Sequence, residues 1–325
     1  MKVVVTGGCG FIGRKTIECL LALNENTKVR ILDNETTCSR HDLNKICDVN
    51  LVEEFSANWD DRVSLLVEDV RNFDAVKSSL QGADAVIHLA ANTGVALSVE
   101  NPHTDCVVNV LGTLNVLEAC RQLQIKRLVF ASSGAPLGQQ TLPLHEELAP
   151  HPASPYGASK LAGEGYCSAY FHSFGVEACI LRFSNVYGPG SGHKSSVVAK
   201  FLQQAVAGED WKIYGDGSQT RDFIYIDDLV SAIIKALLSN NVGGETFQIA
   251  TWHETTISEL VEGLIIVLEE AGIAIPKIEF SKPRIGDVAR NFSTTAKAKK
   301  ILNWEAGINL HEGLKRTLTD YLNML

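Results

Sequence analysis

The sequence contains few of the features that mark membrane-spanning, secreted or metal-binding proteins. No stretch approaches the roughly 20 apolar residues that a helix needs to cross a bilayer. The first residues, MKVVVTGG, begin a strand at once, without an apolar signal segment followed by a small-residue cleavage site. The eight cysteines form no CxxC pair and no zinc-binding spacing, so we expect reduced, structural thiols and no metal. These absences favour a soluble, cytoplasmic protein.

Basic residues are also fewer than acidic residues. The chain has 29 Lys and Arg against 38 Asp and Glu, which gives a formal net charge of −9. This balance argues against nucleic acid or an anionic membrane surface as the main partner. It still allows an anionic small molecule, because a few arginines in a pocket outweigh a diffuse surface charge. The apolar share of 45% is that of an ordinary globular protein, and a length of 325 residues suits two domains.

The first half of the chain alternates short apolar runs with segments of helical periodicity, which predicts parallel βαβ units. The predicted strands are Lys2–Thr6, Val29–Asp33, Val63–Val67, Ala85–Leu89, Leu128–Ala131 and Glu177–Leu181. The predicted helices are Phe11–Leu23, Phe73–Leu80, Asp105–Gln122 and Pro155–Phe174. Residues 34–62 are more polar and are interpreted as a surface insertion. We therefore expect an α/β fold with a Rossmann, doubly wound parallel sheet.

The pattern changes after residues 187–190. The helices predicted there are Val197–Ala207, Asp227–Leu238 and Ile257–Ala271, separated by short strands and Gly-rich turns. We expect a smaller C-terminal α/β lobe, so that residues 1–184 form a dinucleotide-binding domain and residues 185–325 a substrate-binding lobe. No Pro/Ser-rich linker separates the two parts.

The first predicted strand runs into T-G-G-C-G-F-I-G at residues 6–13, directly before a predicted helix. Glycines allow a tight turn and close approach of a pyrophosphate, and the helix start offers unpaired N–H groups. Asp33 ends the second strand, where its carboxylate can accept hydrogen bonds from the adenosine ribose and would repel a 2′-phosphate. The pattern thus favours NAD over NADP. The alternative is a glycine turn that merely packs a helix on a strand.

Two further strand ends are candidates for the cofactor site. Asp69 and Val70 follow the third strand and can reach the adenine edge, although Asp69 can equally cap the helix that starts near Phe73. His88 begins H-L-A-A, whose small residues are consistent with a ligand close to the backbone. We interpret His88 itself as a core or cofactor-packing residue rather than a general base.

Tyr156 and Lys160 lie one helical turn apart at the start of the predicted helix 155–174. A phenol with a pKa of about 10 is a poor base at neutral pH. A fixed ammonium group, together with a positively charged nicotinamide ring, favours the phenolate and lowers that pKa. Ser133, at the end of the fifth strand, supplies a hydroxyl for the same reacting oxygen. The four-residue spacing of Tyr156 and Lys160 is weak evidence for a catalytic pair by itself. It becomes strong evidence because it follows a predicted dinucleotide-binding half and a serine pair at a strand end.

Further motifs are N-V-L-G-T (109–113), Ser132-Ser133, Y-G-A-S-K (156–160), R-F-S-N-V-Y-G (182–188), Y-G-D-G-S-Q-T-R-D-F (214–223) and R-I-G-D-V (284–288). With residues 6–13 and 88–91, they make essentially the whole chain resemble the extended short-chain dehydrogenase/reductase family, and specifically its nucleotide-sugar 4-epimerases of the UDP-glucose 4-epimerase type.

The resemblance implies an NAD-dependent epimerase that oxidises C4 of a UDP-sugar transiently and returns the hydride to the opposite face. The implied catalytic residues are Ser133, Tyr156 and Lys160. The implied cofactor-binding residues are Gly7, Gly10, Phe11, Ile12, Gly13, Asp33, Asn34, Asp69, Val70, Leu89, Ala90, Ala91, Tyr156 and Lys160. The implied substrate-binding residues are Ser133, Asn185, Arg221, Arg284, Asp287 and Asn291. Planar guanidinium groups independently suit a diphosphate.

Departures from the family pattern narrow the reaction. Related dehydratases and decarboxylases carry acidic residues just after the catalytic hydroxyl residue, whereas this chain has Gly134 and Ala135. Leu137 stands where the family usually has tyrosine, which puts any role of that tyrosine in doubt. Asn291 resembles a gate position of the sugar pocket and is smaller than the tyrosine of some members, so an N-acetyl sugar is expected to fit.

Other functions remain open. A UDP-uronic acid epimerase would favour a cationic or multi-hydroxyl site near Thr93, Ser98 or Thr113. A net reductase of 4-keto sugars would release its cofactor and prefer NADPH, which Asp33 disfavours. A non-catalytic dinucleotide sensor on the same fold commonly lacks an intact Tyr/Lys pair, and this chain keeps both. The family also suggests a homodimer through the helices 105–122 and 155–174.

Overall fold

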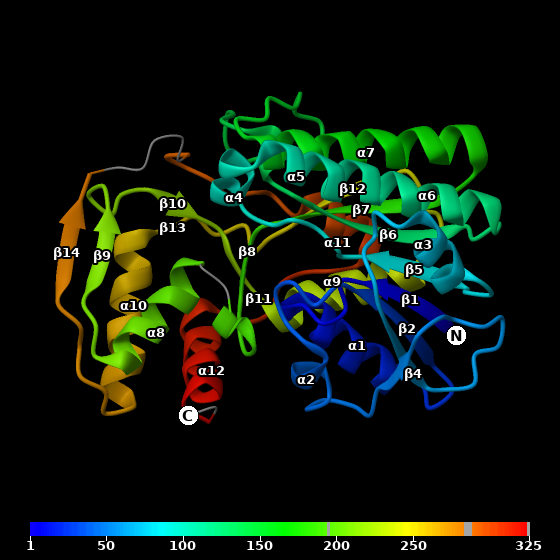
Figure 1. Ribbon diagram of the computed structural model, residues 1–325. Coiled ribbons are helices and arrows are strands. Elements are labelled where there is room, and N and C mark those ends of the chain that lie inside the picture. Colours follow the sequence, from blue (N-terminus) through cyan, green and yellow to red (C-terminus); the bar gives the residue numbers. More distant parts are fainter. Residues whose placement is uncertain (194–195, 283–287, 324–325) are drawn as a thin grey trace. The chain divides into compact units, whose positions relative to one another are not determined.

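The computed structural model describes residues 1–193, 196–282 and 288–323 (Figure 1). Contacts between residues divide this part of the chain into two compact units. The first holds residues 1–138, 149–182 and 230–247, and the second holds the described parts of residues 139–148, 183–229 and 248–325. The functional division expected at residues 184 and 185 stays a prediction, because these contacts define the units without reference to a ligand.

An eight-stranded sheet with the order β12-β7-β6-β5-β1-β2-β4-β3 forms the centre of the first unit. Its strands are β1 (Lys2–Thr6), β2 (Lys28–Asp33), β3 (Asn50–Val52), β4 (Val63–Val67), β5 (Ala85–His88), β6 (Arg127–Ser133), β7 (Glu177–Phe183) and β12 (Thr246–Ile249). Every neighbouring pair from β3 to β6 is parallel. The order reverses at β1, as in doubly wound folds. The predicted fold class and all six predicted strands are confirmed.

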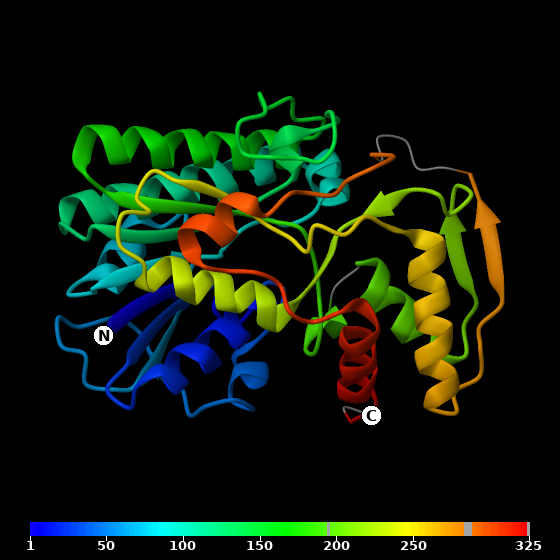
Figure 2. The same cartoon turned by 180° about the vertical axis from the view of Figure 1, so that it is seen from behind.

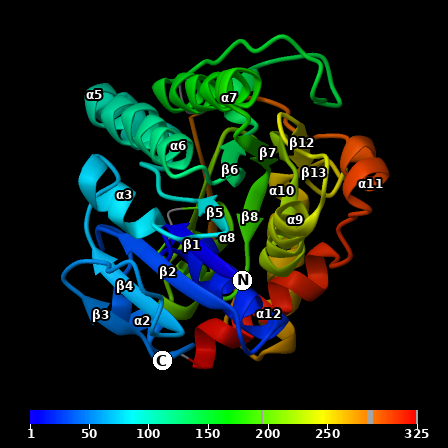
Figure 3. The same ribbon diagram turned by 90° about the vertical axis from the view of Figure 1, so that its right-hand side faces the viewer.

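Helices cover both faces of this sheet. They are α1 (Phe11–Leu23), α2 (Arg40–Leu43), α3 (Phe73–Leu80), α4 (Val95–Glu100), α5 (Pro102–Cys106), a π-helical turn (Val107–Leu111), α6 (Gly112–Gln122), a 3-10 turn (Ala135–Leu137) and α7 (Pro155–Phe174). Helices α3, α6 and α7 lie on one side of the sheet, where Val4 and Leu32 join their apolar core (Figure 3). Helix α1 lies on the other side (Figures 1 and 2). Because successive strand residues face opposite sides, Val3 and Val5 point that way and both faces are buried.

The helix predicted over residues 105–122 is interrupted by the π-helical turn at residues 107–111. Gly112 follows it and packs against Val70, since a Cβ on Gly112 would lie 2.7 Å from Val70 Cγ2. Apolar residues continue through the turn, so periodicity alone does not reveal the extra residue that widens it. Helix α4 was not predicted, because it exposes Val95, Leu97 and Val99 and lacks an apolar face directed at the core.

The segment predicted as a surface insertion, residues 34–62, contributes α2 and the edge strand β3. Strand β3 is short and leaves Leu51 half exposed, so its sequence lacks the pattern of a buried strand. The loop after β3 is fastened by Arg30 of β2. Its guanidinium lies 4.2 Å from the centre of the Trp59 ring and donates to the carbonyl oxygen of Ser56 at 2.7 Å.

The described residues of the second unit form short strand pairs and five helices, one of them only in part. Strand β8 (Asn185–Tyr187) is parallel to β11 (Phe223–Tyr225), β9 (Trp211–Tyr214) is parallel to β14 (Ile278–Ser281), and β10 (Thr220–Arg221) is antiparallel to β13 (Thr255–Thr256). The helices are α8 (Val197–Ala207), α9 (Ile226–Leu238, up to Leu229 in this unit), α10 (Ile257–Glu270), α11 (Ala296–Leu302) and α12 (Leu310–Asn323), with a 3-10 turn at Ser191–His193. The three helices predicted for this part are confirmed.

Within the described ranges, no helix is long and apolar enough to cross a membrane. Over the same ranges, no group of three or more His, Cys, Asp or Glu side chains is placed to hold a metal ion.

Gly138 tests how tightly the first unit packs behind β6. Its φ of 63° is left-handed, and a Cβ there would lie 1.9 Å from the carbonyl oxygen of His151. Gly175 is the matched control, because its φ is 70° but a Cβ added to it would have nothing within 4 Å. We expect Gly175→Ala to cost about 1–2 kcal/mol from backbone strain alone. Gly138→Ala should cost about 1–3 kcal/mol more from the clash. Urea unfolding measures both, and equal losses would show that His151 moves aside freely.

Candidate active site

The glycine turn lies between β1 and α1. The Gly7 N–H donates to the Leu32 carbonyl oxygen at 2.9 Å. A Cβ on Gly13 would lie 2.3 Å from the Gly7 oxygen, and a Cβ on Gly7 would lie 2.7 Å from the Ala90 nitrogen. These two glycines are therefore required by packing inside the protein. Gly10 differs, because a Cβ there would meet only the Gly7 oxygen at 3.2 Å, and it leaves the start of α1 without a capping side chain. The N–H groups at Phe11 and Ile12 are the ones that such a helix start offers to a phosphate.

Asp33, the last residue of β2, lies beside this turn. Its Oδ2 accepts a hydrogen bond from the Cys9 N–H at 2.9 Å, and its Oδ1 accepts one from the Glu35 N–H at 2.8 Å. Burial raises the pKa of Asp33 although both hydrogen bonds act to lower it. A carboxylate next to a glycine turn and an open helix start is the donor and acceptor set that an adenosine diphosphate requires. These residues fit the dinucleotide expected from the sequence.

The next strand end brings Asp69 and Asn34 together. The Asn34 Nδ2 donates to Asp69 Oδ2 at 2.8 Å, and Arg71 forms an ion pair with Asp69 Oδ1 at 2.8 Å. Burial raises the pKa of Asp69, but the hydrogen bonds from Arg71 and Asn34 outweigh it and leave the pKa below its ordinary value. The alternative role of Asp69 as the cap of α3 is wrong, because Asn72 accepts the capping hydrogen bond from Ala75.

Val70 and the H-L-A-A segment are held mainly by the protein's own contacts. Val70 is buried, and its carbonyl oxygen accepts a hydrogen bond from Asn115 at 3.0 Å. Leu89 donates its N–H to the Thr6 carbonyl oxygen at 3.1 Å. Ala90 contacts Gly7, so the small residues expected for a ligand are also needed for this backbone contact, and Ala91 is half-buried.

His88 is buried and takes part in an ordered chain of hydrogen bonds. The Thr113 hydroxyl donates to the Asn109 carbonyl oxygen at 2.6 Å, so it accepts from His88 Nε2 at 3.0 Å. His88 Nδ1 then accepts from the Thr6 hydroxyl at 2.7 Å. Burial, with Lys160 nearby, lowers the pKa of His88 to about 3. His88 is thus a neutral core residue with both ring nitrogens occupied, in line with the interpretation from the sequence.

Helix α7 places Tyr156 and Lys160 through its N-terminal geometry. Ser154 caps the helix by accepting the Gly157 N–H at 3.1 Å, and Pro155 occupies the first turn. Tyr156 therefore stands in the first turn, and Lys160 follows one turn later on the same face. This local sequence fixes both side chains relative to the sheet end.

The structure brings Ser133, Tyr156 and Lys160 together at the end of β6. Tyr156 and Ser133 share a side-chain hydrogen bond that lowers the Tyr156 pKa, the direction expected when the serine hydroxyl donates. Ser133 in turn accepts the Ala135 N–H at 3.2 Å. Lys160 is 4% exposed, and its Nζ donates to the Ala131 carbonyl oxygen at 2.9 Å. These three side chains can therefore take a proton from a single hydroxyl group placed beside them and return it.

The expected lowering of the Tyr156 pKa by Lys160 is not supplied by the protein alone. Burial raises the pKa of Tyr156 to about 12, the Ser133 hydrogen bond lowers it, and the charge of Asp105 raises it further. Burial lowers the pKa of Lys160 to about 8, although Asp105 and Glu164 act to raise it. Desolvation of the phenol, which the spacing of Tyr156 and Lys160 does not reveal, is the largest effect on its pKa.

The substrate-binding candidates fall in the second unit. Asn185 is exposed at the start of β8, and its N–H donates to the Asp222 carbonyl oxygen at 3.0 Å. Arg221 is half-buried in β10 and donates to the Val288 carbonyl oxygen at 2.7 Å. Asn291 is also half-buried, and its N–H donates to the Thr220 hydroxyl at 3.3 Å. Arg284 and Asp287 lie outside the described residues.

Sequence reasoning missed several buried polar groups around α7. Asp105 is 1% exposed and accepts a hydrogen bond from Asn109, which also contacts Ser159 at 3.0 Å. Glu164 is 6% exposed and pairs with Arg182. One signal was present: Asp105 and Asn109, like Lys160 and Glu164, are one helical turn apart on faces that otherwise bury apolar or small residues.

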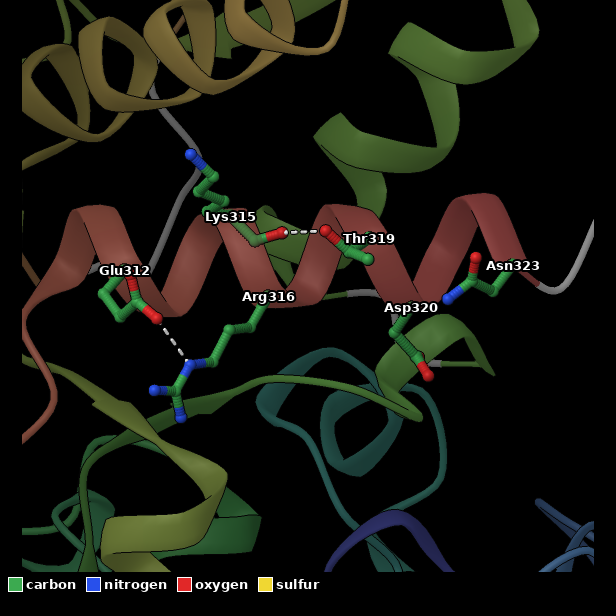
Figure 4. A pocket seen from close by; sticks show the side chains of 6 residues that line it. All are labelled: Glu312, Lys315, Arg316, Thr319, Asp320 and Asn323. Atoms are coloured by element: carbon green, nitrogen blue, oxygen red, sulfur yellow. Dashed lines mark hydrogen bonds and ion pairs between the residues drawn. The ribbon is translucent and has the colours of Figure 1, made fainter.

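A surface hollow of about 470 Å³ lies along α12 in the second unit. Figure 4 shows its polar lining, in which Arg316 pairs with Glu312 at 2.7 Å and Thr319 donates to the Lys315 carbonyl oxygen. None of its lining residues is a candidate from the sequence, and several already have partners within the second unit: Lys315 donates to Glu270 at 2.8 Å, and Asp320 accepts the Gly190 N–H at 2.8 Å. We assign the chemistry to the end of β6 and α7 instead.

Comparison with known proteins identifies the family of the chain. The family described as the NAD dependent epimerase/dehydratase family matches residues 3–250. A putative UDP-glucose 4-epimerase of Methanocaldococcus jannaschii is 38% identical over 321 residues, which cover 97% of both chains. The UDP-glucose 4-epimerase of Thermotoga maritima, solved with UDP-glucose, has a TM-score of 0.87 at 31% identity, covering 100% of this chain and 99% of that one. The UDP-glucuronic acid 4-epimerase of Bacillus cereus, solved with UDP-glucuronic acid and NAD, has a TM-score of 0.88 at 29% identity over 100% of both chains.

The buried neutral state of His88 predicts a pH dependence of stability. The pKa of His88 is near 3 in the folded protein and near 6.5 as a free group, so the unfolded chain binds the proton first as pH falls. This contribution is complete above pH 6.5 and is lost on acidification, by about 3 kcal/mol of unfolding free energy at about pH 4. His88→Gln removes the titration but keeps a polar side chain. Thermal unfolding from neutral pH to about pH 4 should show a steeper loss in the original protein, and parallel losses would contradict a neutral His88.

Proposed function

Because the chain belongs to the NAD-dependent epimerase/dehydratase family, we propose that it is an NAD-dependent UDP-sugar 4-epimerase that interconverts UDP-glucose and UDP-galactose. The observation that carries this proposal is the joint placement of Ser133, Tyr156 and Lys160 at the end of β6, in the unit that also holds the glycine turn and Asp33. A dinucleotide sensor would need none of the three. The retained pair argues for catalysis.

In the proposed mechanism, Tyr156 accepts the proton of the sugar 4-hydroxyl and later gives it back. Ser133 donates to the same oxygen and holds the transient 4-keto group in place. Lys160 stabilises the tyrosinate and would contact the nicotinamide ribose. NAD, once bound, would supply the hydride acceptor for C4 and a second positive charge beside that of Lys160. Gly7, Gly10 and Gly13 and the start of α1 would hold its diphosphate, and Asp33, Asn34 and Asp69 would hold its adenosine part.

The residues after Ser133 argue against the dehydratase and decarboxylase reactions of related enzymes. Elimination of water across C5 and C6 and decarboxylation both use an acidic side chain at this strand end. Gly134 and Ala135 provide none, and the Ala135 N–H is used by the Ser133 hydroxyl at 3.2 Å. The site can thus exchange a proton and a hydride at C4 without removing a proton at C5.

The three hydroxyl groups expected to favour a uronic acid substrate give that alternative little support. Ser98 is buried and donates to the Val95 carbonyl oxygen at 2.7 Å. Thr113 is committed to Asn109 and His88. Thr93 alone is exposed. Two of the three hydroxyls are therefore used inside the protein.

We further propose that Asn185, Arg221 and Asn291, with Arg284 and Asp287, bind the UDP-sugar in the C-terminal lobe. When the nucleotide is anchored, the keto intermediate cannot escape while its sugar ring rotates. The enzyme thus uses binding energy from groups away from the reacting centre. Guanidinium groups such as that of Arg221 suit a diphosphate.

A cytoplasmic homodimer is the proposed state of the enzyme. Helix α7 exposes a stripe of small residues, Ala158, Gly165 and Ala169, and nothing lies within 4 Å of a Cβ built on Gly165. Leu111, 44% exposed, adds apolar surface at the π-helical turn before α6. Small residues on an exposed helix face suit close packing against a second copy. All eight cysteines are free thiols, which suits a reducing compartment.

Replacing Tyr156 with phenylalanine tests the proposed reaction. The variant keeps the ring and loses the proton acceptor, so epimerisation of UDP-glucose should fall by about 100- to 10,000-fold. NAD released on denaturing the purified protein should stay at the level of the original protein. Tyr170→Phe is the matched control on the same helix, since its hydroxyl only bonds Glu118, and it should keep full turnover. Near-normal epimerisation by the Tyr156 variant would overturn the assignment.

Asn291 tests which sugars are accepted. If it gates the sugar pocket, the original protein should turn over UDP-N-acetylglucosamine and UDP-glucose at similar kcat/KM. Asn291→Tyr should then lower kcat/KM for the N-acetyl sugar by about 10- to 200-fold, while changing that for UDP-glucose little. Nuclear magnetic resonance of the anomeric protons separates the products. Complete discrimination against the N-acetyl sugar by the original protein would remove this hypothesis.

A further inference from the structure

A buried ionic cluster lies behind the catalytic residues and has no role in the proposed mechanism. It consists of Ser132 on β6, Glu164 on α7 and Arg182 on β7, which are 3%, 6% and 5% exposed. The Ser132 hydroxyl donates to Glu164 Oε1 at 2.5 Å. Arg182 donates from Nε to Glu164 Oε1 at 2.9 Å and from Nη2 to Glu164 Oε2 at 2.7 Å. The two-pronged geometry fixes the carboxylate strongly.

This cluster continues the contacts that hold the catalytic side chains. Tyr156, Lys160 and Glu164 follow one another at one-turn intervals along the same face of α7. Their partners are all on β6: Tyr156 bonds Ser133, Lys160 bonds the Ala131 carbonyl oxygen, and Glu164 bonds Ser132. The three contacts form a ladder between one helix and one strand. Only the third contact is tied to another strand, through Arg182.

Stability alone explains this ion pair poorly. Both charges are taken out of water, and desolvation of such a pair is often not repaid by its attraction. Arg182 Nη1 is buried with no hydrogen-bond partner among the described residues, so the pair is also incompletely satisfied. Well-packed apolar residues at the two positions would often serve stability equally well. Apolar residues could not form the directional hydrogen bond that Glu164 accepts from Ser132, the neighbour of the catalytic serine.

We propose that Glu164, held by Arg182, is a positioning residue that fixes the register of α7 on β6 through Ser132 and thereby sets the distances among Ser133, Tyr156 and Lys160. The proposal rests on the proposed function for the identity of the catalytic groups. It predicts that the cluster contributes to kcat and little to KM, because the UDP-sugar is bound by the C-terminal lobe. A displacement of about 1 Å at reacting groups is enough to cost about 100-fold in rate.

The decisive experiment replaces both charges together. Glu164→Met with Arg182→Met removes the ion pair without leaving a lone buried charge, so the melting temperature should stay within a few degrees of the original. Turnover of UDP-glucose should fall about 10- to 100-fold in kcat, with KM and NAD content unchanged. Ser132→Ala keeps the ion pair and loses only the link to β6, and it should lower kcat by about 5-fold without a change in KM.

A matched control uses an ion pair elsewhere. Glu312 and Arg316 form an exposed pair on α12 (Figure 4), and Glu312→Gln should leave kcat, KM and melting temperature unchanged. Original kcat in the double methionine variant would overturn the positioning role and leave the pair a structural element. A rise in KM with unchanged kcat would overturn it as well.

A crystal structure of the double methionine variant distinguishes failure of this proposal from failure of the proposed function. If the original protein epimerises no UDP-sugar, the proposed function fails, and the positioning role is decided by the structure alone. We expect the bond between Ser133 and Tyr156 or that between Lys160 and Ala131 to be broken in the variant. Both bonds retained at their original lengths would overturn the proposal.

Discussion

Helix α7 can bring its polar side chains onto strand β6 only because Gly163 leaves room for Phe130. A Cβ on Gly163 would lie 2.5 Å from Phe130 Cζ, so the helix approaches the sheet at the limit of van der Waals contact. At that separation Lys160 reaches the Ala131 carbonyl oxygen, and its Nζ lies 5.1 Å from the centre of the Phe130 ring. A wider spacing would expose the ammonium to water and separate Tyr156 from Ser133. The proposed chemistry therefore depends on one close helix–strand contact.

The same closeness sets the electrostatics of the first unit. Lys160 is buried, which lowers its pKa to about 8, and the nearby charges of Asp105 and Glu164 counteract that effect. Its positive charge adds to burial in keeping His88 neutral. The net charge of −9 counts the whole chain, and the buried Lys160 is a local cation whose pKa the charge of Asp105 raises. A further positive charge from a bound ligand would favour the tyrosinate, because burial and Asp105 both raise the pKa of Tyr156.

The sequence predicted the first residue of a helix correctly where glycine or proline marks the boundary. Helix α1 begins at Phe11 and α7 begins at Pro155, both as predicted, and the structure adds that Ser154 caps α7. The π-helical turn at residues 107–111 was missed because its apolar residues continue without a break. The cap of α3 could not be chosen from the sequence, since the carboxylate of Asp69 and the amide of Asn72 are both good caps, and only the chain geometry selects Asn72. Glu164 contacts Ser132 on β6 and Arg182 on β7, and hydrophobic periodicity does not indicate which strands lie side by side.

The end of β6 restricts the reaction by what it lacks as well as by what it holds. An acid after the strand end can help to remove the C5 proton of a 4-keto sugar before water is eliminated, or can assist loss of carbon dioxide from C5 of a 4-keto uronic acid. Both reactions compete with return of the hydride. Here Gly134 and Ala135 follow Ser133, and the Ala135 N–H donates to the Ser133 hydroxyl at 3.2 Å. The Ser133 oxygen accepts in this contact, which leaves its proton available for the hydrogen bond with Tyr156. Because neither Gly134 nor Ala135 carries a side chain that can take a proton, this strand end favours return of the hydride in the proposed reaction, to the original face of the keto intermediate or to the other.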